Sequence, residues 1–320
     1  MAAVLALAGD TMLGRGVADR LGRDPPASLV SSRLRAVLQE ADATVLNLEC
    51  CLSDRGDPWP APGKRFHFRA PPTATDLLLA LGTVAVTLAN NHALDYGVDA
   101  LSDTLEHLEK AGIAVVGAGR DVGEARRPAV VRVGHEHLAL VGLTDHPEDF
   151  AAGPGTPGVA FADLSRGLPP WVVAAVHAAR QRAPVLVTPH WGPNMVRDPV
   201  PHVRRAADEL GDLRPALVAG HSAHVFHGVS GRVLFDLGDF VDDYAVHPAL
   251  RNDLGLLWLL TLDGGVFTRL DAVPLRLRYA FTDLADGDDQ EWVRRRFRAA
   301  CAALGTDVAD DDGRLVVDLR

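Results

Sequence analysis

Thr87-Leu88-Ala89-Asn90-Asn91-His92-Ala93-Leu94-Asp95-Tyr96-Gly97 is the stretch that decides the fold. It follows Val84-Ala85-Val86, an apolar and β-branched run that predicts a buried strand. It precedes residues 98–111, where leucines recur at helical spacing until Gly112 ends the pattern. In open α/β sheets ligands bind at the carboxyl ends of such strands. We therefore expect the polar residues of this stretch to lie at a ligand site, although Asn-Asn is also ordinary turn chemistry.

The composition indicates a globular protein that does not bind nucleic acid. The chain has 320 residues, of which 48% are hydrophobic, and this is enough for a large buried core. Its net charge of −10 argues against a nucleic-acid-binding surface. We expect one main domain over residues 1–275 and a C-terminal extension over 276–320 that packs on it.

Cysteine usage and hydropathy predict a cytoplasmic protein without a membrane span. The three cysteines include the adjacent pair Cys50-Cys51, which does not form a disulfide framework. The sequence contains no apolar run as long as a membrane span. Gly9-Asp10 interrupts the apolar N-terminus, which therefore differs from a signal peptide. The sequence gives no indication of the oligomeric state.

Strands and helices alternate along the chain, which predicts an α/β fold. Further strands are predicted over residues 4–8, 43–49, 113–117, 185–188, 216–219, 233–237 and 315–319. Helices are predicted over 31–41, 76–81, 171–183, 203–210 and 291–304. Hairpins are predicted over 129–144 and 254–277. Two Pro- and Gly-rich loops, 53–72 and 145–170, are long enough to expect a function for them.

Polar side chains recur where the predicted strands end. These residues are Asp10, Glu49, Asn91, His92, His190, His221 and His224. Because the carboxyl ends of parallel strands share one edge of a sheet, residues far apart in sequence can converge there. Buried together, such groups need partners or a metal. The set mixes nitrogen and oxygen donors, so it is better suited to a site for two divalent ions of manganese, iron or zinc than to a thiolate metal site.

Several motifs occur in order along residues 4–245. They are Gly9-Asp10-Thr11-Met12-Leu13-Gly14-Arg15, Asn47-Leu48-Glu49, Phe68-Arg69-Ala70-Pro71-Pro72, the central stretch, Gly117-Ala118-Gly119, His190-Trp191-Gly192, Gly220-His221-Ser222-Ala223-His224 and Leu237-Gly238-Asp239-Phe240-Val241. In these motifs the chain resembles the bacterial CapA, or poly-γ-glutamate synthesis, proteins, which in turn resemble calcineurin-like metallophosphoesterases. The resemblance implies a four-layer α/β/β/α sandwich of the metallophosphoesterase type, with the metals at one edge.

The resemblance also implies which residues bind the metals. Asp10 and His224 would hold the first ion, and Glu49 would bridge both ions. The ligands of the second ion would be Asn91, His190 and His221. These assignments are expectations carried over from the family, residue by residue.

The resemblance makes His92 a proton donor or a stabiliser of the transition state, oriented by Asp95. Basic residues flank the motifs and are candidates for binding an anionic substrate through charge-assisted hydrogen bonds. These residues are Arg15, Lys64, Arg65 and Arg69. The alternative for each is an ordinary solvated surface charge. The loop over residues 53–72 is expected to lie over the metal edge.

Three positions depart from the family pattern. Met12 stands where phosphoesterases of this fold have a histidine ligand, so the first metal would have fewer protein ligands. Asn194 stands where the family usually has a glutamate. Asp239 replaces the usual asparagine, and we expect it to contact substrate, to act as a replacement ligand or to cap a turn.

The sequence thus predicts a dinuclear metal-dependent hydrolase. A hydroxide that bridges the two metals would attack a phosphoester or an amide or γ-glutamyl-type bond in a small anionic substrate or peptide. One alternative is a metal-dependent enzyme that forms amide bonds in polyglutamate, capsule or specialised peptide biosynthesis. Another is a non-catalytic capsule-assembly scaffold with a vestigial site. Met12 favours the scaffold, whereas His92 favours catalysis.

Overall fold

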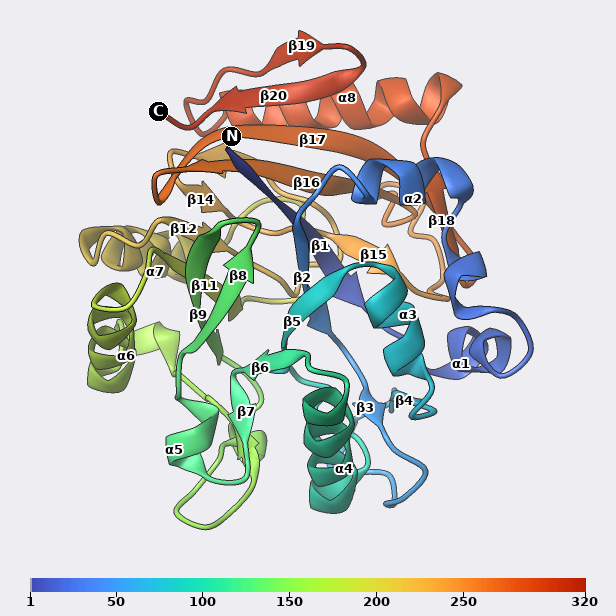
Figure 1. Ribbon diagram of the computed structural model, residues 1–320, viewed down its shortest axis with the longest axis vertical. Coiled ribbons are helices and arrows are strands. Elements are labelled where there is room, and N and C mark those ends of the chain that lie inside the picture. Colours follow the sequence, from blue (N-terminus) through green and yellow to red (C-terminus); the bar gives the residue numbers. More distant parts are fainter. Residues whose placement is uncertain (1) are drawn as a thin grey trace.

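The structure, a computed structural model, describes residues 2–320 and has four layers. Two β-sheets pack face to face, and helices cover the outer face of each sheet (Figure 1). Helices α6 and α7 lie on the left of the view, α1, α2 and α3 lie on the right, and α4 lies at the bottom.

The larger sheet has ten strands. Eight follow the order β19-β20-β17-β16-β1-β2-β5-β6, while β15 pairs with β1 and β18 pairs with β17. The bounds are β1 (Ala3–Thr11), β2 (Ala43–Leu48), β5 (Thr83–Thr87), β6 (Ala114–Val116), β15 (Asp239–Val241), β16 (Leu254–Asp263), β17 (Val266–Arg278), β18 (Phe281–Leu284), β19 (Ala309–Asp311) and β20 (Arg314–Asp318). Strands β1, β2, β5, β6 and β15 are parallel, so their carboxyl ends lie at one edge.

The smaller sheet has six strands in the order β13-β14-β12-β11-β9-β8. The bounds are β8 (Ala129–Val133), β9 (Glu136–Thr144), β11 (Val185–His190), β12 (Leu217–Ala219), β13 (Val229–Ser230) and β14 (Val233–Leu234). Strands β9, β11, β12 and β14 are parallel. Two short pairs lie outside both sheets, namely β3 (Cys51–Leu52) with β4 (Arg69–Ala70), and β7 (Ala118–Gly119) with β10 (Gly158–Val159).

Three buried clusters hold the layers together. Side chains of α2 (Ser32–Leu38), α3 (Ala74–Ala80) and α4 (Gly97–Lys110) pack on one face of the larger sheet, which α1 (Arg15–Leu21) also covers. Side chains of α6 (Pro170–Arg180) and α7 (Pro201–Asp212) pack on the smaller sheet. Between the sheets, Leu7 and Trp258 of one meet Leu140 and Leu186 of the other. This packing confirms the predicted α/β/β/α sandwich.

The C-terminal elements join the larger sheet. Strand β20 pairs with β17, and Phe297 of α8 (Gly287–Ala302) lies 5.5 Å from Trp258 between ring centroids. The division predicted at residue 275 falls within β17 and stays a prediction. The remaining elements are the helix α5 (Val122–Ala125) and the 3-10 turns η1 (Pro26–Leu29), η2 (Glu148–Phe150) and η3 (Leu164–Arg166). Across residues 2–320, every helix is too short or too polar to span a bilayer.

One predicted strand is shorter than expected. The prediction was 233–237, whereas β14 ends at Leu234. The carboxylate of Asp236 accepts hydrogen bonds from the backbone N–H groups of Ala223 and Gly238, at 2.8 and 2.9 Å. An aspartate that bonds to nearby backbone in this way competes with strand pairing. The chain therefore turns here before β15 begins.

Candidate metal centre

The carboxyl ends of both sheets deliver the predicted polar residues to one place. Asp10 lies near the end of β1, opposite Asp239 of β15 in the strand register. Glu49 directly follows β2, and His190 ends β11. His190 forms an isolated β-bridge with His221, which lies just beyond the end of β12. Parallel strands thus bring together residues that are more than 200 positions apart.

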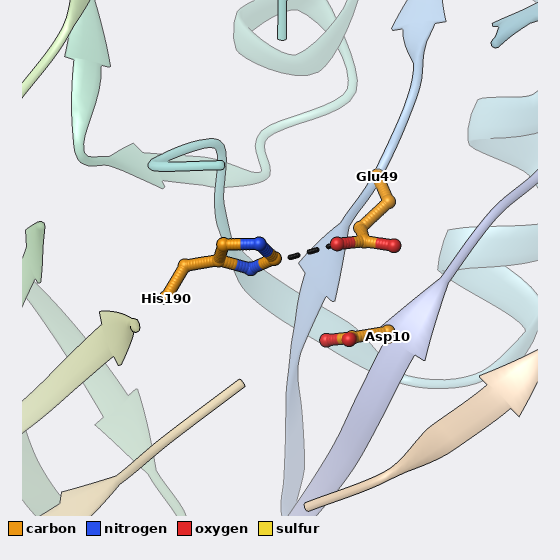
Figure 2. Close-up of side chains that lie close together, drawn as sticks. All are labelled: Asp10, Glu49 and His190. Carbon is orange, nitrogen blue, oxygen red and sulfur yellow. Dashed lines mark ion pairs between the residues drawn. The ribbon is translucent and has the colours of Figure 1, made fainter. Parts of the chain in front are cut away.

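Two groups of side chains are close enough to hold an ion. Asp10, Glu49 and His190 form the first group, in which the ligand atoms lie within 4.8 Å of one another (Figure 2). Asp10, His224 and Asp239 form the second group by the same measure. All five side chains are buried. Asp10 belongs to both groups, so the two groups lie next to each other.

Buried ligand atoms at this centre lack hydrogen-bond partners within the described chain. These atoms are both carboxylate oxygens of Glu49, Oδ1 of Asn91, Nε2 of His190 and Oδ2 of Asp239. His190 Nδ1 lies 3.5 Å from Glu49 Oε1. Leaving a buried polar atom unpaired costs free energy. A divalent cation would supply the missing partner, so the residues present fit a metal site.

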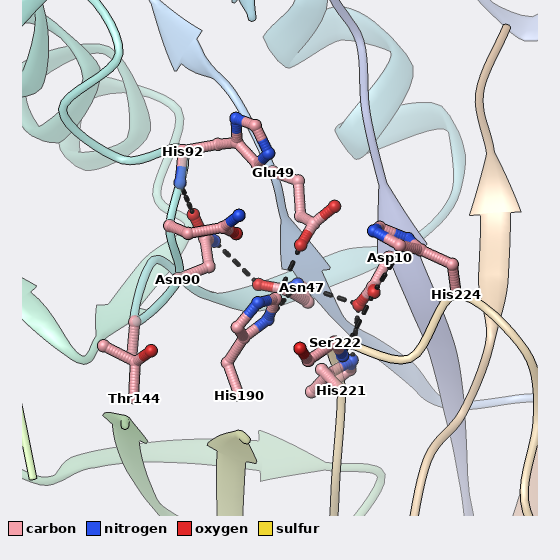
Figure 3. Close-up of polar contacts among 12 residues, drawn as sticks. Asp10, Asn47, Glu49, Asn90, His92, Thr144, His190, His221, Ser222 and His224 are labelled. Atoms are coloured by element: carbon pink, nitrogen blue, oxygen red, sulfur yellow. Dashed lines mark hydrogen bonds and ion pairs between the residues drawn. The ribbon is translucent and has the colours of Figure 1, made fainter. Parts of the chain in front are cut away.

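Two asparagines form a rigid support beneath these ligands (Figure 3). The Asn47 side-chain amide donates to Asp10 Oδ1 at 2.9 Å. The Asn90 amide donates to Asn47 Oδ1 at 2.8 Å and to the Leu48 carbonyl at 2.9 Å. Asn90 Oδ1 also accepts from the His92 N–H at 3.0 Å, which is turn chemistry. The support role of Asn47 and Asn90 was not predicted from the sequence, although both residues lie in the quoted motifs.

Histidines from the smaller sheet complete the centre. His221 Nδ1 lies 3.0 Å from Asp10 Oδ1, and the Ser222 N–H donates to Asp10 Oδ2 at 3.3 Å. His224 Nδ1 lies 2.8 Å from Asp239 Oδ1. The structure therefore brings together the predicted ligands Asp10, Glu49, His190, His221 and His224. Asp239, for which the sequence suggested a role as a replacement ligand, lies with Asp10 and His224. Their role in binding metal is not tested by geometry alone and stays a prediction.

The charges at the centre strongly affect one another. Burial, followed by the charge of Asp10, raises the pKa of Glu49 well above its usual value. Burial and then the charge of Asp242 raise the pKa of Asp239. Burial would also raise the pKa of Asp10, but its hydrogen bond to His221 and the nearby imidazoles outweigh burial and lower it. So many carboxylates cannot all ionise at low cost without cations beside them.

His92 is held by a chain of polar contacts beside the ligands. His92 Nδ1 lies 2.6 Å from Asp95 Oδ2, as predicted. Asp95 Oδ1 also forms an ion pair with Lys64 Nζ at 2.7 Å, and Asp95 Oδ2 accepts a hydrogen bond from the Phe68 N–H at 2.6 Å. Burial lowers the pKa of His92 and outweighs the opposing effect of Asp95. The contact with Asp95 leaves His92 Nε2 for other partners.

Met12 is part of the core, not of the centre. Its side chain is fully buried in the cluster under the helices, and its sulfur accepts from the Gly14 N–H at 3.1 Å. The position that is a histidine in phosphoesterases therefore offers no nitrogen donor here. Asp239 instead lies within reach of Asp10 and His224.

The predicted substrate-binding residues lie in different surroundings. Arg15 pairs with Asp243 at 2.5 Å and lines a cavity beside His92. Lys64 contacts Asp95, and the Arg69 guanidinium lies 4.2 Å from the centroid of the Tyr96 ring. The Arg65 side chain is exposed, and Asn194 Nδ2 lies 3.3 Å from His224 Nε2. Lys64 and Arg69 thus have partners within the chain, and the role of these residues in binding substrate stays a prediction.

Comparison with known proteins gives consistent matches. The family model described as bacterial capsule synthesis protein PGA_cap matches residues 4–244. The chain is 32% identical to a "Probable polyglutamine synthesis accessory protein" of Mycobacterium tuberculosis, with 93% of this chain and 91% of that protein covered. It is 28% identical to the PGA biosynthesis protein CapA of Bacillus subtilis, over 73% of this chain and 62% of that protein. A solved structure titled as a novel phosphatase of Mycoplasma pneumoniae aligns with a TM-score of 0.48 and 9% identity, covering 86% of this chain and 94% of that chain.

Proposed function

The chain belongs to the bacterial capsule synthesis protein family PGA_cap, and from this premise we propose that it is a hydrolase that depends on two divalent metal ions. Manganese, iron and zinc suit the mixed donor set. The bond cleaved is a phosphoester or an amide of a small molecule or peptide. One observation supports the metal-dependent hydrolase most. Buried ligand atoms of Glu49, Asn91, His190 and Asp239 have no hydrogen-bond partner within residues 2–320.

Side chains from both sheets would position the metal ions. Asp10 and Glu49 would anchor the ions from the larger sheet, and His190 and His221 from the smaller one. When bound, such ions activate water and polarise the oxygen of the scissile group. Asn47 fixes the Asp10 carboxylate through its hydrogen bond, so Asp10 does not have to reorient when a ligand enters.

His92 would transfer the proton. Its Nδ1–H is held by Asp95, so Nε2 is the nitrogen that can act on a substrate. Because burial lowers its pKa, His92 is neutral before the reaction. It would take a proton from the attacking water and give that proton to the leaving oxygen or nitrogen. Asp95 would stabilise the imidazolium while it exists.

A second candidate function is amide-bond formation during polyglutamate or capsule synthesis. The observation that favours it is the naming of the relatives from Mycobacterium tuberculosis and Bacillus subtilis. The same centre would then hold a carboxyl group that a nucleoside triphosphate has converted to an acyl phosphate. The amine would attack the acyl carbon, and inorganic phosphate would leave. Release of inorganic phosphate that depends on both amine and nucleotide would distinguish this function from hydrolysis.

The proposal predicts that the purified protein contains divalent metal. After growth in medium supplemented with manganese, iron and zinc, and purification without chelators, elemental analysis should find up to two ions per chain. Metal at 100 times its Kd stabilises a fold by about 2.7 kcal/mol, so a chelator should lower the Tm and added metal should restore it.

The outcome that contradicts this prediction is a metal-free protein whose Tm is unchanged by chelator and by each of the three metals. Metal-loaded protein should then be tested on phosphomonoesters, phosphodiesters and peptide amides. Turnover that requires metal supports the hydrolase. Bound metal without turnover on any of these bonds favours the scaffold.

A further inference from the structure

A cavity of about 470 Å³ opens beside the candidate metal centre. His92 and His224 form part of its wall, so the cavity adjoins both the proposed acid–base residue and a proposed ligand. Phe66 and Phe68 contribute from the loop over residues 53–72, and Tyr244 contributes from the segment after β15. Segments that are far apart in the sequence thus line one space next to the centre.

The wall of the cavity is largely apolar and aromatic. Phe66, Phe68, Met195, Tyr244, Val246 and Pro248 all line it. The Phe68 ring lies 4.2 Å from the His92 ring and 5.8 Å from the Tyr244 ring between centroids. Phe66 and Val246 both line the cavity and remain 58% and 52% exposed, so a ligand in the cavity can reach their apolar surface.

The polar groups on the wall already have partners within the chain. The guanidinium of Arg15 pairs with Asp243 at 2.5 Å and lies 5.5 Å from the Phe68 ring centroid. His247 Nδ1 accepts from the N–H groups of Ala249 and Leu250, at 3.2 and 3.1 Å. The Asn252 amide oxygen likewise accepts from the His247 N–H. The cavity therefore presents little free positive charge to a polyanion.

Tyr244 is the exception among these polar groups. Its hydroxyl is buried and has no hydrogen-bond partner anywhere in the described part of the chain. Its ring lies 5.3 Å from the His224 ring between centroids, at the side of the cavity that meets the centre. A buried phenol normally finds a partner. An oxygen atom of a bound substrate would provide one.

We propose that this cavity binds an uncharged apolar group, aromatic or branched aliphatic, attached to the scissile amide, and that the Tyr244 hydroxyl donates to the amide oxygen. This assignment rests on the proposed function, and it adds the substrate class. In this assignment, different residues bind the reacting amide and the apolar group attached to it. The centre binds the reacting group, whereas Phe66, Phe68 and Val246 bind the apolar side chain next to it.

The test is equilibrium binding of N-(4-fluorobenzyl)acetamide, followed by its fluorine resonance, with N-methylacetamide as the small control amide. Both metal-free and metal-loaded full-length protein are used. Burying a phenyl-sized group corresponds to about 10–100-fold in affinity, so the benzyl amide should bind at least tenfold more tightly than the methyl amide. Equal affinity of the two amides for both forms of the protein overturns the proposal.

Three variants locate the binding. Phe66→Ala, Val246→Asp and Tyr244→Phe should each weaken binding of the benzyl amide by about three- to tenfold. Leu79→Ala, which removes a 50% exposed leucine on α3 outside the cavity, is the matched control and should have no effect. An unchanged affinity in all three cavity variants would also contradict the proposal.

The two proposals fail in different ways. Selective binding of the benzyl amide by a protein that never retains metal would contradict the hydrolase and leave the cavity assignment intact. Metal-dependent turnover with no preference for the benzyl amide would support the hydrolase and contradict the cavity assignment.

Discussion

Replacing His92 with asparagine is expected to lower the turnover number about 10²–10⁴-fold, the usual contribution of general acid–base catalysis. Asparagine keeps a side-chain amide that can donate towards Asp95, which holds His92 Nδ1 at 2.6 Å. It has no group that can take up and release a proton near neutral pH. Metal content and Tm should therefore stay close to those of the unmodified protein. Elemental analysis, thermal unfolding and single-turnover rates on one substrate measure these quantities.

Two further variants make the His92 result specific. His135→Asn changes a histidine with a 62% exposed side chain in the turn between β8 and β9, and it should alter none of the three measurements. Asn91→Ala removes an amide oxygen that is buried and unpaired within residues 2–320, so it should lose metal as well as activity. Loss of metal in His92→Asn would identify His92 as a ligand. Full activity in that variant would favour the scaffold.

The convergence of the site could be predicted because it depends on strand order and strand direction. Glycine-punctuated apolar runs predicted where Asp10, His190 and His221 leave their strands, and parallel pairing then places those ends together. The hairpin predicted over residues 254–277 was also correct, since Gly264 and Gly265 in its turn determine it locally. In these places local pattern and tertiary fold agree.

The roles of neighbouring residues could not be predicted in the same way. Asn90 and Asn91 are equivalent in sequence, but only Asn90 meets Asn47 and becomes part of the support. Lys64 is a predicted substrate-binding residue, and its sequence neighbours did not reveal that Asp95 lies 2.7 Å from its ammonium group. No sequence pattern near Tyr244 indicates that its hydroxyl lacks a hydrogen-bond partner within residues 2–320. That property depends on how segments far apart in the sequence pack around it.

The structure presents two candidates for the carboxylate that bridges the ions. Asp10 belongs to both groups of potential ligands, whereas Glu49 belongs to one. However, Asp10 Oδ1 already accepts from Asn47, and Oδ2 accepts from the Ser222 N–H. Both oxygens of Glu49 are without partners among the residues described. Glu49 therefore has all its oxygen lone pairs available for ions, whereas hydrogen bonds already occupy part of those of Asp10. This difference favours Glu49 as the bridge, as the sequence resemblance does.

Glu49→Ala is therefore expected to lose more metal than Asp10→Ala. Removing the bridge weakens the binding of both ions. Loss of a group that only supports a ligand lowers metal affinity about 10–100-fold, and the affinity for each ion should fall by at least as much here. Because the ions contribute several kcal/mol to transition-state stabilisation, the rate should fall by more than 100-fold. Metal titration monitored by Tm and by elemental analysis measures the affinities, with Glu109→Ala, a carboxylate with 74% side-chain exposure, as the control. If Asp10→Ala lost both ions and Glu49→Ala retained one, Asp10 and not Glu49 would be the bridging carboxylate. Intact metal in both variants would show that neither carboxylate is a ligand.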